Sequence, residues 1–303
     1  AYQKNKDNIS EKIGNNSFYS IQENENGKYD QMYNDDGTPV GVSAGRAFMR
    51  KAFVVGILLA IIVPCIGIIV VLKRLSMMGD ALSHSSLAGI AAGLVLSINP
   101  VLGAVITSLI AAFSIEFIRK KIPKYSEMSI AIIMSAGVGL AGVLSGFVKN
   151  SADFNSFLFG SIVAITDFEL VMVIGISVLV MICFILLYKE LMYMAFDEEG
   201  ARMVGIPVKS VNFIFTILTA FTVSIAARTV GALIVSSMMV VPVACAMKFA
   251  KSYKQTVLFS ILLALIFTII GLTLSYYLGL KPGGTIVLSG VAFLILTIII
   301  KRD

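Results

Sequence analysis

Long apolar blocks without charged residues recur from residue 52 to the C-terminus, separated by short polar segments. The hydrocarbon core of a bilayer needs about 20 consecutive apolar residues per helix. The block at 81–115 is too long for one helix, and Asn99-Pro100 divides it, because proline cannot continue a helix. The pattern predicts up to nine membrane-spanning helices, with eight as the alternative, near residues 52–72, 82–97, 101–118, 128–148, 170–188, 210–227, 229–247, 255–280 and 282–300. The short candidates at 82–97, 101–118 and 229–247 also fit broken or partly re-entrant helices.

Composition decides the class of protein. Hydrophobic residues make up 57% of the chain and charged residues only 14%, against roughly 25% charged residues in soluble domains. This balance excludes the two soluble domains that 303 residues would otherwise allow. The predicted fold class is therefore all-α, a polytopic transmembrane helical bundle. The three cysteines stand alone in apolar stretches, which argues against a disulfide framework and a thiolate metal cluster.

The placement of lysine and arginine predicts an orientation, because cytoplasmic loops are enriched in basic residues. With nine spans and an external N-terminus, 14 of the 24 basic residues lie inside, including clusters at 119–124 and 248–254. Ten lie outside, four in residues 1–45 and six in the rest of the chain, and three of these six, Arg46, Arg50 and Lys51, count against the assignment. We therefore predict an external N-terminus and an internal C-terminus. The net charge of +6 resides at block ends and predicts no nucleic-acid partner.

Residues 1–45 differ from the rest of the chain. They are rich in Asn, Asp, Glu and Gly, contain no apolar run and carry four lysines against seven acids. Such a composition buries too little apolar surface to fold by itself. We predict a largely disordered extracellular tail over residues 1–45, followed by a membrane domain over residues 46–303.

Asp80 and His84 are the candidate metal ligands. They are four residues apart, so in a helix they share one face, one turn apart. An ionisable residue within a membrane span is costly and normally faces a cavity or a partner. A carboxylate and an imidazole together suit a first-row divalent metal. The alternative is structural, with Asp80 as a helix N-cap and His84, the only histidine, hydrogen-bonded to a neighbouring helix.

The polar segment 195–207 is the candidate coupling element. Acids cluster at its start, Gly205 stands where a helix would stop, and Pro207 prevents continuation. We expect a short cytoplasmic amphipathic helix there, serving either as a solvated loop or as a docking element for a soluble partner. The residues of this candidate site are Asp197, Glu198, Glu199, Gly200, Ala201, Arg202 and Gly205.

Other polar and sulfur-containing residues have simpler interpretations. Glu116 lies near Arg119 and Lys120, so an ion pair is favoured over a role as a third metal ligand. The acids Asp153, Asp167 and Glu169 are expected in a solvated outer loop. Met238 and Met239 are expected to pack in the core, because thioethers are poor ligands for Zn²⁺ or Mn²⁺. The pairs Gly89/Gly93 and Gly142/Gly146 favour close helix packing, within the chain or between subunits.

Five ordered stretches resemble the metal-uptake permeases of bacterial ABC importers, the zinc/manganese/iron group. Together they extend from Phe48 to the C-terminus. The stretches are Leu72-Lys-Arg-Leu-Ser-Met-Met-Gly-Asp-Ala-Leu-Ser-His84, Phe157-Leu-Phe-Gly-Ser161, the segment 197–207, Thr229-Val-Gly-Ala-Leu-Ile-Val235 with Val241-Pro-Val-Ala244, and Pro282-Gly-Gly-Thr-Ile-Val-Leu288. Two further stretches, Ser85-Ser-Leu-Ala-Gly89 and Lys124-Tyr-Ser-Glu127, look more similar to the zinc branch than to the manganese branch.

The resemblance implies a multi-pass permease of the bacterial plasma membrane that works as a homodimer. It implies two cytoplasmic ATP-binding subunits, seated on the 195–207 helix, and an extracellular metal-binding protein. It also implies metal contact at Asp80 and His84. The sequence lacks the G-x-x-x-x-G-K-[ST] phosphate loop, so we expect no enzyme activity in this chain and ATP hydrolysis on a separate subunit.

The expected cargo is a divalent metal ion, with no permanently bound cofactor. Ligand chemistry does not separate Zn²⁺ from Mn²⁺, and only the resemblance favours zinc over manganese or iron. An alternative from another class is a secondary carrier driven by an ion gradient, in which Asp80 and His84 would relay protons.

Overall fold

The computed structural model describes residues 40–122, 125–148, 167–232 and 234–300. The chain divides into two units, Ala1–Lys51 and Ala52–Asp303. In the first unit the described residues are the beginning of helix α2 (Val40–Leu72). The rest of the predicted tail, at residues 1–39, and the motif Phe157–Ser161 lie outside the described residues, whereas residues 40–45 belong to α2. The remainder of α2 and all later helices belong to the second unit.

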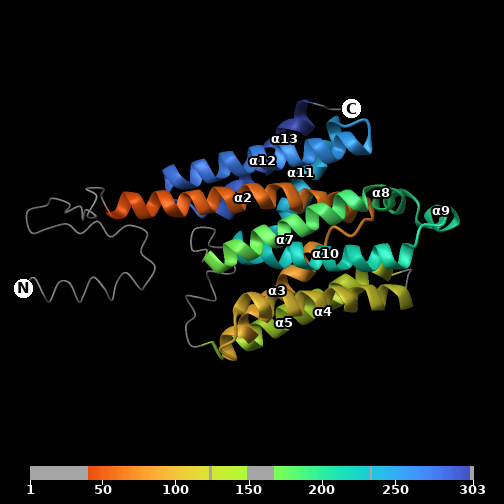
Figure 1. Ribbon diagram of the computed structural model, residues 1–303, viewed down its shortest axis with the longest axis horizontal. Helices are drawn as coiled ribbons and strands as arrows, with labels where there is room; N and C mark the ends of the chain where they lie inside the picture. The colour runs from red at the N-terminus through yellow and green to blue at the C-terminus, as the bar shows by residue number, and fades with distance from the viewer. Residues whose placement is uncertain (1–39, 123–124, 149–166, 233, 301–303) are drawn as a thin grey trace, which may run out of the picture. The chain divides into compact units, whose positions relative to one another are not determined.

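Every regular element among the described residues is a helix, as the apolar pattern predicts. After α2 come ten further helices (Figure 1): α3 (Met78–Val95), α4 (Pro100–Lys121), α5 (Ser126–Ser145), α7 (Asp167–Leu186), α8 (Tyr188–Phe196), α9 (Glu198–Met203), α10 (Val208–Thr229), α11 (Val235–Phe249), α12 (Tyr253–Leu278) and α13 (Pro282–Ile300).

Local chemistry fixes several of these boundaries. The predicted break at Asn99-Pro100 is confirmed: the Asn99 side chain accepts a hydrogen bond from the Val101 amide at 2.9 Å, and Pro100 opens α4. Proline suits this position because the first helical amide has no partner within the helix. Ser252 caps α12 in the same way, and α12 ends at Gly279, whose φ of 65° is left-handed.

The number of full spans differs from the prediction of eight or nine. Seven of the described helices are long and apolar enough to cross a membrane. The apolar helix α11 is shorter, because it begins at Val235 and not at the predicted residue 229. Helix α3 carries Asp80, His84 and several Ser and Gly residues, which lower its hydropathy.

Most residues of helix α3 are buried, although the helix carries several polar side chains. It packs against α4 and α5, and also against α10 and α11 (Figure 1). Gly89 meets the backbone of Gly103 in α4, and Gly93 meets Pro100, so this Gly-x-x-x-Gly pair packs within the chain. No described atom lies near the Cβ position of Gly142, so that second pair makes no such contact.

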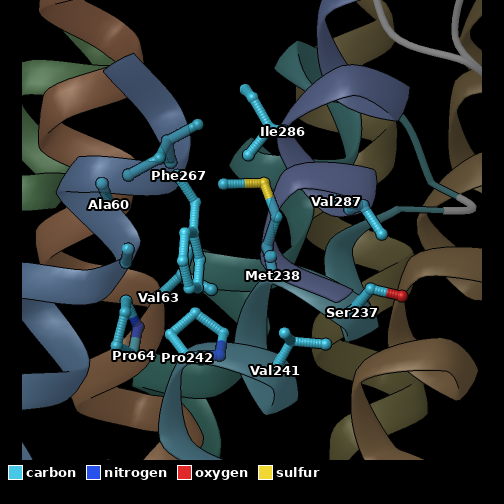
Figure 2. Close-up of a pocket in the computed structure, with 13 residues that line it drawn as sticks. Ala60, Val63, Pro64, Ser237, Met238, Val241, Pro242, Phe267, Ile286 and Val287 are labelled. Carbon is cyan, nitrogen blue, oxygen red and sulfur yellow. The ribbon is translucent and has the colours of Figure 1, made fainter. Parts of the chain in front are cut away.

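A second group of helices surrounds two prolines. Helices α11, α12 and α13 pack together, and α2 joins them where Gly67 meets Met239 and Gly56 meets Thr268. Pro64 of α2 and Pro242 of α11 line one apolar pocket, into which Met238 and Phe267 also project (Figure 2). Each proline lacks an amide hydrogen, so each leaves a backbone carbonyl one turn earlier without its helical hydrogen bond.

Candidate metal site and the adjoining polar cluster

Asp80 and His84 both lie in the first half of α3, which packs against α4, α5, α10 and α11. Residue 77 is the N-cap of α3 and makes no side-chain capping bond, whereas Asp80 lies inside the first turn. The structural alternative, with Asp80 as N-cap, is therefore wrong. A carboxylate in the first turn is still favoured by the helix dipole.

The two candidate ligands are available. Among the residues that the structure describes, neither the Asp80 carboxylate nor the His84 imidazole has a hydrogen-bond or ion-pair partner. Both side chains are half-buried. The neighbouring hydroxyls bond instead to the backbone of α3: Ser83 donates to the carbonyl of Asp80 at 3.0 Å, and Ser85 donates to that of Ala81 at 2.8 Å. Both side chains therefore keep access to solvent, which leaves them open to an external ligand.

The ligand set within the described part of the chain is small. It contains no cluster of three or more His, Cys, Asp or Glu side chains able to hold a metal ion. Asp80 supplies a hard oxygen and His84 a borderline nitrogen, a combination that Zn²⁺ and Mn²⁺ both accept. An incomplete set suits transport, because a passing ion must be bound and then released.

Small residues hold the beginning of α3 against its neighbours. A Cβ atom at Gly79 would stand 3.5 Å from Ser236 Cα and 3.6 Å from Met239 Sδ, so α3 and α11 begin side by side. On the α5 side, a Cβ at Gly137 would stand 2.9 Å from the amide of Ser85. Met238 and Met239 are buried, which confirms their assignment to the core. In transporters, sites commonly form where short or interrupted helices meet.

Two carboxylates expected from sequence have ion-pair partners. Glu116 lies 2.6 Å from Arg119 and 3.4 Å from Lys120, which confirms the ion-pair interpretation. Glu169 was expected in a solvated loop, and this prediction is wrong. Its side chain is buried at the start of α7 and accepts a hydrogen bond from Arg228 Nε of α10 at 2.8 Å. Arg228 is the charge that divides two apolar blocks, so its need for a partner was visible in the sequence.

The predicted short helix within 195–207 is present as α9. The Asp197 side chain accepts a hydrogen bond from the Gly200 amide at 2.9 Å and caps the helix. Ala201 is buried, and Gly205, with φ of 90°, reverses the chain ahead of Pro207. At the end of α9 two neighbouring apolar side chains are exposed, Met203 by 84% and Val204 by 76%. They form an apolar tip that nothing in the described chain covers.

A cluster that the sequence did not predict ties α9 to the end of α2. We define the Lys73 cluster as Lys73, Glu198, Arg202 and Asn212. Lys73 Nζ donates to Asn212 Oδ1 at 2.8 Å and lies 3.6 Å from Glu198 Oε2. Asn212 Nδ2 donates to Glu198 Oε1 at 3.4 Å, and Arg202 lies 3.2 Å from the same oxygen.

Burial lowers the pKa of Lys73, and the nearby Glu198 carboxylate partly opposes this shift. Its side chain is only 8% exposed. An ammonium in such a position depends on its partners to remain charged. Residues 73, 198 and 212 are far apart in sequence, so helix packing, and no local motif, brings them together.

A comparison with known protein families agrees with the multi-helix membrane architecture. The model of the ABC 3 transport family matches residues 46–301. The chain belongs to this family. Membership of the ABC 3 transport family is consistent with the multi-pass membrane domain and with the five stretches that carry the resemblance.

Named relatives support the same assignment. The chain is 36% identical to a probable metal transport system membrane protein of Treponema pallidum, over 84% of this chain and 96% of that one. It is 31% identical to the manganese import system permease protein ScaB of Streptococcus parasanguinis, over 84% and 90%. It is 32% identical to the high-affinity zinc uptake system membrane protein ZnuB of Haemophilus influenzae, over 83% and 97%.

Among solved structures, the chain is similar to a chain of PsaBC from Streptococcus pneumoniae in complex with Fab. The TM-score is 0.75 at 28% identity, and the match covers 83% of this chain and 91% of that one. The two chains thus share their fold over most of their length.

Proposed function

We propose that this chain is the membrane-spanning permease subunit of an ATP-driven importer of a divalent metal ion. The observation that carries the proposal is the pair Asp80 and His84, one turn apart on a largely buried helix and without partners among the described residues. A carboxylate and an imidazole left unsatisfied in a membrane domain are costly unless a cation completes them. The ABC 3 family membership supplies the transport class.

The cargo is Mn²⁺ or Zn²⁺. Relatives with similar identity are named for manganese import and for zinc uptake. The comparisons therefore support zinc no more strongly than manganese. An oxygen and a nitrogen ligand accept either ion. A second copy of the chain facing the same pathway would contribute a second such pair, giving four ligands in a homodimer.

ATP hydrolysis belongs to separate subunits in this proposal. The ABC 3 chain lacks the phosphate loop in its own sequence. Helix α9 is proposed to seat on such a subunit, with Met203 and Val204 as the apolar contact, because exposed apolar side chains on a polar loop mark interaction surfaces. An extracellular metal-binding protein is the proposed source of the ion.

The apolar tip of α9 also defines the mutation that tests docking. Bulky residues at Gly200 or Ala201 would disturb the Asp197 cap or a buried position, and would damage the helix itself. Met203→Asp alters an exposed side chain and leaves the cap intact. It should release the ATPase subunit during purification of the complex, whereas Lys209→Ala, at an exposed site outside α9, should not. Equal retention of the ATPase in both variants would remove α9 from the docking role.

The proposed function is tested with the chain and its ATPase subunits in proteoliposomes. Radioactive Mn²⁺ and Zn²⁺ are offered together with the metal-binding protein, with ATP available to the ATPase. Uptake should require ATP and be insensitive to an imposed pH gradient. Uptake of equal rate without ATP, driven by a proton gradient, would instead establish a secondary carrier.

A further inference from the structure

The ligands and the proposed docking helix lie on different parts of the chain. Asp80 and His84 are on α3, whereas α9 lies between α8 and α10 along the chain. ATP-driven import requires that a displacement of the docking helix alters the metal ligands. Some contact between elements must therefore carry the displacement to α3.

The Lys73 cluster makes such a contact. Glu198 is the first residue of α9, and Lys73 follows the last residue of α2 directly. The ammonium of Lys73 is buried, so separation from Glu198 would leave a charge without compensation. A displacement of Glu198 therefore favours a matching displacement of Lys73.

The segment from Lys73 to Asp80 is short and internally bonded. The amide of Leu75 donates to the Val70 carbonyl at 2.8 Å, and that of Arg74 donates to the Val71 carbonyl at 3.0 Å. These two bonds form the Schellman arrangement that closes a helix, with Arg74 in the left-handed position at φ of 56°. The Met78 amide then donates to the Leu75 carbonyl at 2.8 Å, and both side chains are buried.

A small hollow lies beside the segment from Lys73 to Met78. Lys73, Leu75 and Met78 line it together with Asn212 of α10. Glu116 and Arg119 of α4 complete its charged wall. Met78 begins α3 and stands two residues before Asp80, so the cluster adjoins the start of the ligand helix.

We propose that Lys73 is a positioning residue that links α9, through Glu198, to the helix carrying Asp80 and His84. The proposal rests on the proposed function and adds the route of coupling within the chain. Its competitor is direct packing of α10 against α3, which would transmit the same displacement without Lys73. Lys73 contacts no metal in this scheme and acts on Asp80 through the bonded segment 74–79.

The experiment measures metal ions imported per ATP hydrolysed by the complete complex in proteoliposomes. Lys73→Met keeps the length of the side chain and removes its charge. Glu198→Gln removes the partner charge at a position that is more exposed. Lys73→Arg preserves the charge. Lys120→Met is the matched control, because it breaks another Lys–Glu ion pair, at the end of α4.

The ratio should fall by about fivefold or more in Lys73→Met and in Glu198→Gln, the lower range of coupling between distant sites. ATP hydrolysis should continue in both variants. Lys73→Arg should restore most of the ratio, and Lys120→Met should match the wild type. If Lys73→Met does not assemble, Glu198→Gln decides the outcome.

A ratio within twofold of the wild type in Glu198→Gln and Lys73→Met would overturn the proposal and favour the α10 route. A proportional loss of uptake and hydrolysis would also overturn it, because that result indicates structural damage. Neither result concerns the proposed function, which fails if the wild-type complex imports no metal with ATP or imports it equally well without ATP.

Discussion

The ionisable groups at the start of α3 and those of the cluster around Lys73 differ in whether they have interaction partners. Among the described residues, Asp80 and His84 have no partner, whereas Lys73, Glu116 and Glu198 each have one within 4 Å. The two regions are adjacent, since Met78 of α3 lines the hollow beside Lys73. The difference shows how a membrane protein can use charge in two ways. The groups without partners form the proposed metal site, and the Lys73–Glu198 pair connects the end of α2 to α9.

The largest expected effect is at the unsatisfied pair. Asp80→Asn or His84→Gln keeps the approximate size of the side chain and removes a ligand. Because each subunit offers only two such ligands, saturable Mn²⁺ and Zn²⁺ uptake should fall by about 100-fold or more, as expected when a metal loses a ligand of an already incomplete set.

Ser83→Ala is the control, since its hydroxyl donates to the backbone carbonyl of Asp80 within α3. It should transport at close to the wild-type rate. Radiometal uptake and metal-dependent growth measure both effects. Wild-type uptake in the Asp80 and His84 variants would show that these groups are unsatisfied for another reason.

The sequence predicted most helices, but α2 begins at Val40 and not at residue 52, and α11 begins at Val235 and not at residue 229. The break at Asn99-Pro100 and the turn at Gly205 were visible because proline and glycine act locally. The late start of α11 was missed, because residues 230–234 are apolar and look helical in composition. A hydropathy pattern indicates which residues prefer an apolar environment. It does not indicate whether the backbone continues as a helix.

The same distinction applies to the site. Asp80 and His84 were predictable from spacing, because one helix turn brings them together. The Glu169–Arg228 and Lys73–Glu198 pairs join distant segments, so only tertiary packing reveals them. Nothing in the sequence distinguished Glu169 from the other acids of the expected outer loop, although its side chain is buried near the start of α7.

A buried satisfied pair should cost stability when only one partner is removed. Arg228→Met would leave Glu169 buried without its guanidinium partner, at a cost of about 3 kcal/mol. The thermal midpoint of the purified protein in detergent should drop by several degrees. The double variant Arg228→Met/Glu169→Leu should recover part of the loss, because no charge is then isolated. Losses that simply add would show that the pair contributes no interaction energy.

A smaller effect is expected from pH at Lys73. Burial lowers its pKa below the ordinary value of 10.5, against the opposing effect of Glu198 and Glu116 and with Arg119 acting in the same direction as burial. Lys73 is charged below its folded-state pKa, so its ion pair is lost as the pH rises through that value. The import ratio should therefore fall at alkaline pH below 10.5, by about twofold or more.

Lys73→Arg provides the comparison, because a guanidinium stays charged throughout this range. The variant should keep a constant import ratio over the same pH interval. Identical alkaline losses in the wild type and in Lys73→Arg would assign the pH effect to another group.

The smallest effect is expected at Glu116, which tests the comparison from the satisfied side. Its carboxylate is paired with Arg119 and Lys120 at the end of α4. Glu116→Gln should leave the affinity for Mn²⁺ within about twofold of the wild type, since a carboxylate held by two cations offers little attraction to a third. Pairs of this spacing on a helix contribute only about 0.5 kcal/mol, so stability should change little. Equilibrium binding of Mn²⁺ to the purified complex measures the affinity, with Asp80→Asn as the variant that must lose it. A loss of affinity at Glu116 comparable to that at Asp80 would place this carboxylate among the metal ligands and remove the distinction between the two regions.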